Sequence, residues 1–108
     1  MKSSDARLVD VNSVEANSSV GQPDSWQQFL RRPTDADAIA MHRLVATTGV
    51  LDLNSTYAYL LMATDFADTC IVADRGGELC GLITGYHPPT RPEVLFVWQV
   101  AVAASARG

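Results

Sequence analysis

The longest apolar run of the chain lies at residues 94–102. These nine residues include one polar side chain, Gln99, and they are rich in β-branched and aromatic types. Such a run predicts a central strand that is buried on both faces of a sheet. A buried helix is the alternative for a run this short, but the valines together with Phe96 and Trp98 favour a strand.

The pattern at residues 35–47 predicts a helix. Thr34 and Asp37 form a capping-box signature at its start, and Gly49 follows as a stop signal. The early carboxylates also suit the positive end of a helix dipole. Apolar residues recur on one face of this segment, at Ala38, Met41, Leu44 and Val45.

A second helix is predicted to follow a loop at residues 50–55 and to end near residue 65. Asn54 or Ser55 can cap its first turn, because these side chains accept hydrogen bonds from free backbone N–H groups. The inner stripe of this helix is expected to contain Tyr57, Leu60, Leu61 and Thr64.

Three further strands are predicted, at residues 25–32, 69–73 and 78–87. The last two form a hairpin around residues 74–77, where two glycines tolerate positive φ. Residues 87–92 contain prolines that cannot donate to a sheet, so they form a loop before the apolar strand. The resulting order is β-α-α-β-β-β, an α/β fold.

The composition fits one modest globular domain. Of 108 residues, 47% are hydrophobic and 19% are charged, and the net charge is −4. No basic patch is present to neutralise phosphates, so neither nucleic acid nor an anionic membrane is expected as a partner. Residues 1–25 are polar and aperiodic, which predicts a disordered tail before a domain at residues 26–108.

The two cysteines, Cys70 and Cys80, lie in separate apolar runs. Buried reduced thiols are expected, with a disulfide across the hairpin as the alternative, and no metal site is expected. No apolar run approaches the ~18 residues of a membrane span, and the N-terminus has no hydrophobic signal region. A cytoplasmic protein is therefore predicted.

Three sequence blocks resemble a known family. They are TGVLDLNS at residues 48–55 with YAYLL at 57–61, DFADTC at 65–70, and RPEVLFVWQVAV at 91–102. With the element order, they resemble the GCN5-related N-acetyltransferases (GNAT superfamily), and within these the L-2,4-diaminobutyrate acetyltransferases of ectoine biosynthesis. The resemblance covers about residues 29–108. It implies a mixed, mainly antiparallel sheet.

The same resemblance implies a reaction. An acetyl group would move from acetyl-CoA to the 4-amino group of L-2,4-diaminobutyrate, giving N4-acetyl-L-2,4-diaminobutyrate for compatible-solute synthesis and osmoadaptation. Acetyl-CoA would be the co-substrate, the diamine would be the small-molecule partner, and no metal would be needed. The acceptor amine would attack the thioester directly.

The family's coenzyme loop reads Gln or Arg, two variable residues, Gly, one variable residue, and Gly or Ala. Arg107 matches the first position and Gly108 matches the next. The rest of the loop, the following helix and the last strands lie outside these 108 residues. The resemblance therefore implies the N-terminal part of an acetyltransferase domain, truncated after the fourth strand, either as a fragment of an enzyme or as a truncated gene product.

Three residues are candidates for binding the diamine. Asp52 lies between two leucines just before the second helix, and we expect its carboxylate to bind a substrate amine; capping that helix or facing water is the alternative. Tyr57 on the first turn is expected to line the acceptor pocket, or else to be a core tyrosine. Trp98 is expected to form an apolar wall that desolvates the amine, with plain core packing as the alternative.

Five residues are candidates for binding the coenzyme. The resemblance implies that Val100, Ala101 and Val102 use free backbone groups to bind the pantetheine arm and to polarise the thioester carbonyl. Arg107 and Gly108 would begin the pyrophosphate-binding loop. No residue is assigned as the general base or as the proton donor to the leaving thiol.

Two alternatives remain for the function. One is acetylation of another small amine by an enzyme of the same superfamily. The other is an inactive remnant that lacks the coenzyme site. A homodimer is possible, and an uncovered apolar strand at a sheet edge predicts that the 108-residue chain is poorly soluble or self-associated.

Overall fold

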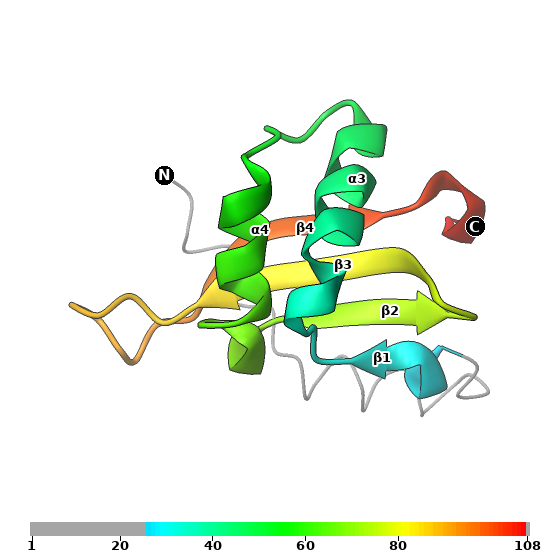
Figure 1. Ribbon diagram of the computed structural model, residues 1–108. Helices are drawn as coiled ribbons and strands as arrows, with labels where there is room; N and C mark the ends of the chain where they lie inside the picture. The colour runs from blue at the N-terminus through cyan, green and yellow to red at the C-terminus, as the bar shows by residue number, and fades with distance from the viewer. Residues whose placement is uncertain (1–25, 108) are drawn as a thin grey trace.

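The structure is a computed structural model, and it describes residues 26–107 of the chain (Figure 1). The tail expected at residues 1–25 and the candidate Gly108 lie outside the described residues. The elements, in chain order, are the 3₁₀ turn Gln27–Phe29, β1 Leu30–Arg31, the 3₁₀ turn Asp35–Asp37, α3 Ala38–Thr48, α4 Thr56–Ala63, the 3₁₀ turn Ala67–Thr69, β2 Ile71–Arg75, β3 Glu78–Tyr86, β4 Phe96–Val102 and the 3₁₀ turn Ala104–Ala106.

The four strands form one sheet in the order β1-β2-β3-β4, and each neighbouring pair is antiparallel. Helices α3 and α4 lie side by side across one face of this sheet (Figure 1). The predicted order β-α-α-β-β-β and the α/β class are therefore confirmed. The core lies between the helices and the sheet, and is formed by residues such as Met41, Val45, Tyr59, Val72 and Leu82.

The start of α3 follows the predicted capping box. Thr34 and Asp37 bond to each other through side chain and backbone, and Gly49 ends the helix with φ 70°. A positive φ strains any residue with a Cβ, so glycine suits this stop. The predicted capping box and stop are confirmed, but the first turn, Asp35–Asp37, is 3₁₀, and α3 itself begins at Ala38.

The first strand is shorter than predicted. Trp26 has helical backbone angles, and a 3₁₀ turn occupies Gln27–Phe29, so that only Leu30 and Arg31 pair with β2. The Trp26 ring packs edge-on against Phe29 at 5.6 Å and lies beneath the Arg75 guanidinium at 4.8 Å. These contacts favour a turn where the sequence pattern suggested an extended segment.

The hairpin prediction is confirmed with a tighter turn, because β2 lies two residues further along the chain than predicted. Pairing continues to Arg75 and Glu78, so Gly76 and Gly77 alone form the turn, with φ of 65° and 88°. Cys70 and Cys80 are both buried free thiols, as expected.

Two burial predictions are wrong. The buried side chains of α4 are Tyr59, Met62 and Ala63, whereas Tyr57 is 64% exposed. Nearly every residue of α4 is apolar, so its sequence does not identify the inner face. The last strand is buried on one face only: Val100 is 48% exposed, because both helices lie on the other side of the sheet.

Candidate active site

The middle of β4 contains a β-bulge. Thr84 pairs with Gln99 and Gly85 pairs with Val97, which leaves Trp98 as an extra residue without a partner on β3. The backbones come very close there, since a Cβ on Gly85 would lie 2.6 Å from the Phe96 carbonyl oxygen. Glycine is therefore required at residue 85, where the bulge brings the two backbones too close for a side chain.

The bulge directs two consecutive side chains of β4 towards α4. The Trp98 ring stacks on the Tyr59 ring at 5.5 Å, and the Tyr59 hydroxyl donates to Gln99 Oε1 at 3.0 Å. Consecutive residues of a regular strand face opposite sides of the sheet. The extra residue removes this alternation, so a stacking contact and a polar contact meet on one tyrosine.

The same tyrosine and glutamine hold the loop that precedes α4. Gln99 Nε2 donates to the Asp52 carbonyl oxygen at 2.7 Å, and the Asn54 N–H donates to the Tyr59 hydroxyl at 3.4 Å. Tyr59 is fully buried and Gln99 is 5% exposed. The loop backbone is thus bonded to the core, while the side chains of residues 52–55 are exposed.

One edge of β4 presents unpaired peptide groups. Ala103 donates its N–H to the Cys80 carbonyl at 2.9 Å, and the same register pairs Ala101 with Leu82. Because bonded and non-bonded pairs alternate in an antiparallel ladder, Ala101 bonds to β3, whereas Val100 and Val102 direct their N–H and C=O groups away from it. Within residues 26–107 no strand pairs with that edge.

The candidate diamine-binding residues occupy different environments. The Asp52 side chain is exposed, and its backbone is bonded to the residue next to Trp98. Trp98 is half-buried against Tyr59. Tyr57 lies two residues before Tyr59, about 200° around α4, and so faces the opposite side of the helix. The structure therefore places the Asp52 backbone beside Trp98 and leaves Tyr57 exposed on the first turn of α4, directly after the same loop.

The candidate coenzyme residues follow one another along the free edge. Val100 and Val102 carry the unpaired groups, and the Ala101 side chain is buried in the core. A 3₁₀ turn then leads to Arg107, whose side chain is exposed. The ligand roles of all these residues stay predictions.

Sequence reasoning assigned no role to Tyr59 or Gln99. Gln99 carried a visible signal, since it is the single polar side chain in the longest apolar run. A buried amide needs partners, so this signal would have indicated a polar contact inside the core, an inference that the sequence analysis did not make. Tyr59 lies in a helix of almost uniform hydrophobicity and gave no comparable signal.

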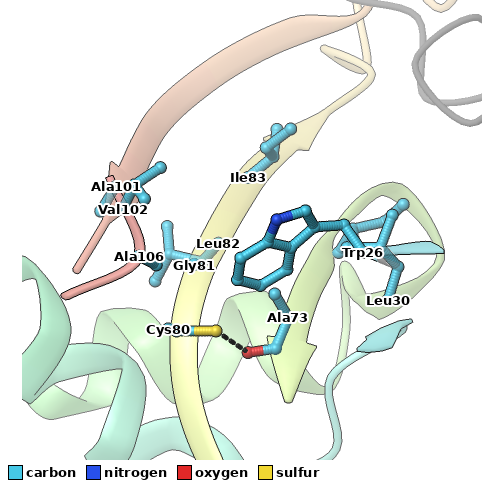
Figure 2. A pocket seen from close by; sticks show the side chains of 11 residues that line it. Trp26, Leu30, Ala73, Cys80, Gly81, Leu82, Ile83, Ala101, Val102 and Ala106 are labelled. Atoms are coloured by element: carbon cyan, nitrogen blue, oxygen red, sulfur yellow. Dashed lines mark hydrogen bonds between the residues drawn. The ribbon is translucent and has the colours of Figure 1, made fainter. Parts of the chain in front are cut away.

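The sheet face opposite the helices carries an apolar pocket (Figure 2). The Trp26 ring covers part of it, with Ile83, Val102 and Ala106 among the other lining residues. No charged side chain lines this pocket. It offers packing surface, and the thiol that lines it, Cys80, is buried and bonded to the Ala73 carbonyl.

The two thiols are unsuited to nucleophilic work. Burial raises the pKa of Cys70, and its thiol donates weakly to the Gly85 carbonyl at 3.7 Å. Cys80 makes the equivalent contact with the Ala73 carbonyl at 3.5 Å (Figure 2). No group of three or more His, Cys, Asp or Glu side chains among residues 26–107 is placed to hold a metal ion. In the same range no helix has the length and apolarity to cross a membrane.

Comparison with known proteins identifies the family. The acetyltransferase (GNAT) family model matches residues 37–108, which is more than half of the chain. This chain belongs to the GNAT family of acetyltransferases. The fold and family inferred from the sequence blocks are thereby confirmed.

Relatives of this GNAT chain carry a more specific name. It is 48% identical over 104 residues to the L-2,4-diaminobutyric acid acetyltransferase of Bordetella parapertussis, covering 94% of this chain and 56% of that protein. It is 49% identical over 81 residues to the enzyme of the same name from Chromohalobacter salexigens, covering 74% and 42% respectively. The chain thus spans about half the length of the curated relatives it matches.

Solved structures agree with this relationship. Diaminobutyrate acetyltransferase from Paenibacillus lautus, solved with L-2,4-diaminobutyric acid and coenzyme A, matches with a TM-score of 0.70 and 47% identity over 72% of this chain and 47% of that chain. The loading GNATL domain of CurA from Lyngbya majuscula matches at 0.56 with 12% identity over 73% of this chain and 49% of that one, which supports the fold alone.

Proposed function

We propose that this GNAT chain is the acceptor-binding part of a diaminobutyrate acetyltransferase. The whole enzyme would transfer the acetyl group of acetyl-CoA to the 4-amino group of L-2,4-diaminobutyrate. The observation that carries the proposal is the placement of the Asp52 loop, whose backbone is bonded to β4 beside a strand edge with unpaired peptide groups. The names of the relatives support the choice of substrate.

The reaction needs a neutral amine next to a thioester. An alkyl ammonium has a pKa of ~10, so deprotonating it near neutral pH costs roughly 3–4 kcal/mol. In our proposal the Asp52 carboxylate binds the cationic diamine. The half-buried Trp98 ring removes water from the amine that reacts, and this desolvation favours the neutral form.

The free edge of β4 would bind the other substrate. N–H and C=O groups of Val100 and Val102 can pair with the amides of a pantetheine arm, as a neighbouring strand would. An N–H group aimed at the thioester carbonyl would also stabilise the negative charge that develops on its oxygen. Arg107 supplies a positive charge further along, where the coenzyme's phosphates would lie.

An acetylation assay with a panel of amines tests this proposal. A complete enzyme that contains this chain is incubated with acetyl-CoA and L-2,4-diaminobutyrate, L-ornithine or putrescine, and products are identified by NMR. The proposal predicts acetylation of L-2,4-diaminobutyrate at the 4-amino group in preference to the other two amines. Equal use of all three, or acetylation at the 2-amino group, would contradict it.

A further inference from the structure

A buried hydrogen-bonded chain connects β4 to the loop before α4. It runs from the Asp52 carbonyl to Gln99 Nε2 (2.7 Å), from Gln99 Oε1 to the Tyr59 hydroxyl (3.0 Å), and from that hydroxyl to the Asn54 N–H (3.4 Å). The two loop contacts lie on either side of residue 53. They hold a short stretch of backbone, residues 52–54, at two points.

The polar groups of this chain lie inside an otherwise apolar layer. Tyr59 belongs to the same buried cluster as Met41, Val45 and Met62, and Gln99 lies on the same strand as the buried Ala101. A buried, hydrogen-bonded amide or hydroxyl adds little stability over an apolar side chain of similar shape, and it costs free energy whenever a partner is lost. Core stability alone therefore does not account for a glutamine and a tyrosine hydroxyl at these positions.

The bonds constrain the loop in a specific way. They engage backbone atoms of residues 52–54 and leave the Asp52 carboxylate without a bond to the core. The Asp52 side chain is thus free to bind a ligand, while its Cα position relative to Trp98 is set by Gln99, the residue adjacent to Trp98. The β4 bulge places both the indole ring and the amide on this side of the sheet.

We propose that Tyr59 and Gln99 are positioning residues for the acceptor amine, acting through the backbone of residues 52–54. This inference rests on the proposed function, since it assumes that Asp52 binds the diamine. Loss of either polar group would free the loop, and the carboxylate would then sample positions away from the Trp98 ring. Affinity for the diamine would fall, while the fold would remain.

Two near-isosteric substitutions test the proposal. Tyr59→Phe keeps the ring stacked on Trp98 and removes the hydroxyl, and Gln99→Met keeps the side-chain length and removes both amide contacts. Hydrogen exchange measured by NMR is expected to be about tenfold faster at the Asn54 amide in Tyr59→Phe, after normalisation to the Leu82 amide in the core. Calorimetry with L-2,4-diaminobutyrate is expected to show about tenfold weaker binding in both variants.

Thr84→Val is the matched control. Thr84 is also fully buried and pairs with Gln99 across the strands, and its hydroxyl donates to the Gln99 carbonyl at 3.4 Å without contacting the loop. The Thr84→Val substitution thus removes a buried polar group from the same sheet. Hydrogen exchange at the Asn54 amide and affinity for L-2,4-diaminobutyrate are expected to match those of the unmodified chain.

The outcomes separate this inference from the proposed function. If the unmodified chain binds the diamine and Gln99→Met binds it equally well, the positioning role is wrong and the proposed function stands. Unchanged exchange at Asn54 in Tyr59→Phe also overturns the positioning role. If the unmodified chain binds no L-2,4-diaminobutyrate, both the proposed function and the role built on it fail.

Discussion

At the scale of single residues, the strongest charged contacts join the start of α3 to the sheet. Arg31 donates to both oxygens of Asp37, at 2.8 and 3.0 Å, and also to Asp74 at 3.0 Å. The Arg31 hydrogen bonds lower the pKa of Asp37, burial opposes them, and the Thr34 N–H adds to the lowering. The carboxylate therefore stabilises the folded chain only when it is ionised.

The stability contributed by Asp37 has a defined pH dependence. Because the pKa of Asp37 is lower in the folded state than its usual 3.8, this stability is fully present above about pH 5 and is lost as the pH falls through the folded-state pKa. Asp37→Asn is expected to lower the free energy of unfolding at pH 7 by about 1–2 kcal/mol, a value reduced because water screens the partly exposed Arg31. Urea unfolding at pH 7 and pH 3 measures both effects.

Asp68→Asn is the control for this prediction. Asp68 contacts Arg32 at 3.8 Å, and both side chains are largely exposed. Exposed pairs of this kind contribute little, so its stability should equal that of the unmodified chain at both pH values. Two results would show that the Arg31 contacts are not stabilising. One is an equal loss in the free energy of unfolding in Asp37→Asn and Asp68→Asn, and the other is an Asp37→Asn chain as stable as the unmodified one at pH 7.

At the scale of secondary-structure elements, the sequence was most informative where local chemistry decides the outcome. The capping box at Thr34, the stop at Gly49 and the glycine turn of the hairpin all depend on nearby residues. The buried face of α4 could not be predicted, because its side chains are apolar on all sides and only the sheet selects Tyr59. The contact of Tyr59 with Gln99 joins residues 40 positions apart, and no local pattern encodes it.

The exposure of β4 follows the same reasoning. Its apolar sequence predicts a strand covered on both faces, and within residues 26–107 the helices cover one face alone. The sequence thus identified the strand but not which face is covered. Of the candidate site, the sequence pointed to Asp52, Tyr57 and Trp98: the Asp52 backbone lies beside Trp98 through Gln99, Tyr57 is exposed on the first turn of α4, and their ligand roles stay predictions.

The β-bulge gives a direct prediction at Gly85. Gly85→Ala would place a Cβ 2.6 Å from the Phe96 carbonyl oxygen and 3.3 Å from the Val97 Cα, so the strands must separate. We expect a loss of about 2–3 kcal/mol in the free energy of unfolding, as for other overpacked sites. Chemical denaturation with circular dichroism measures it.

Gly81→Ala serves as its counterpart on the same strand. There the nearest atoms to a new Cβ lie at 3.6 Å, an ordinary contact distance. Its stability should change by less than about 1 kcal/mol, because the added methyl meets no clash. If Gly85→Ala and Gly81→Ala lose equal amounts of free energy of unfolding, the close backbone approach at the bulge is ruled out.

At the scale of the whole molecule, the described sheet has one covered face and one open face. The open face and the free edge of β4 meet at Val100 and Val102, which are 48% and 38% exposed. An apolar edge with unpaired N–H and C=O groups is a template for pairing with another chain. The geometry that suits a pantetheine arm therefore also favours contact between copies.

This geometry predicts self-association of the 108-residue chain. Gel filtration should give an apparent mass above 11.6 kDa that increases with concentration. Val100→Lys should shift elution towards the monomer, since a charge on this edge opposes pairing. Ile39→Lys, at a position 58% exposed on α3, should leave elution unchanged. A monodisperse monomer at all concentrations would disprove this prediction.

The central claim is that the Asp52 carboxylate binds the diamine beside β4. The most direct test is calorimetric titration of L-2,4-diaminobutyrate into the unmodified chain, Asp52→Asn, and Asp65→Asn as an exposed acidic control beyond α4. The account predicts binding by the unmodified chain and by Asp65→Asn, and at least about tenfold weaker binding by Asp52→Asn, because the substitution removes a charge-assisted hydrogen bond. Equal affinity in all three proteins, or no binding by the unmodified chain, would contradict it.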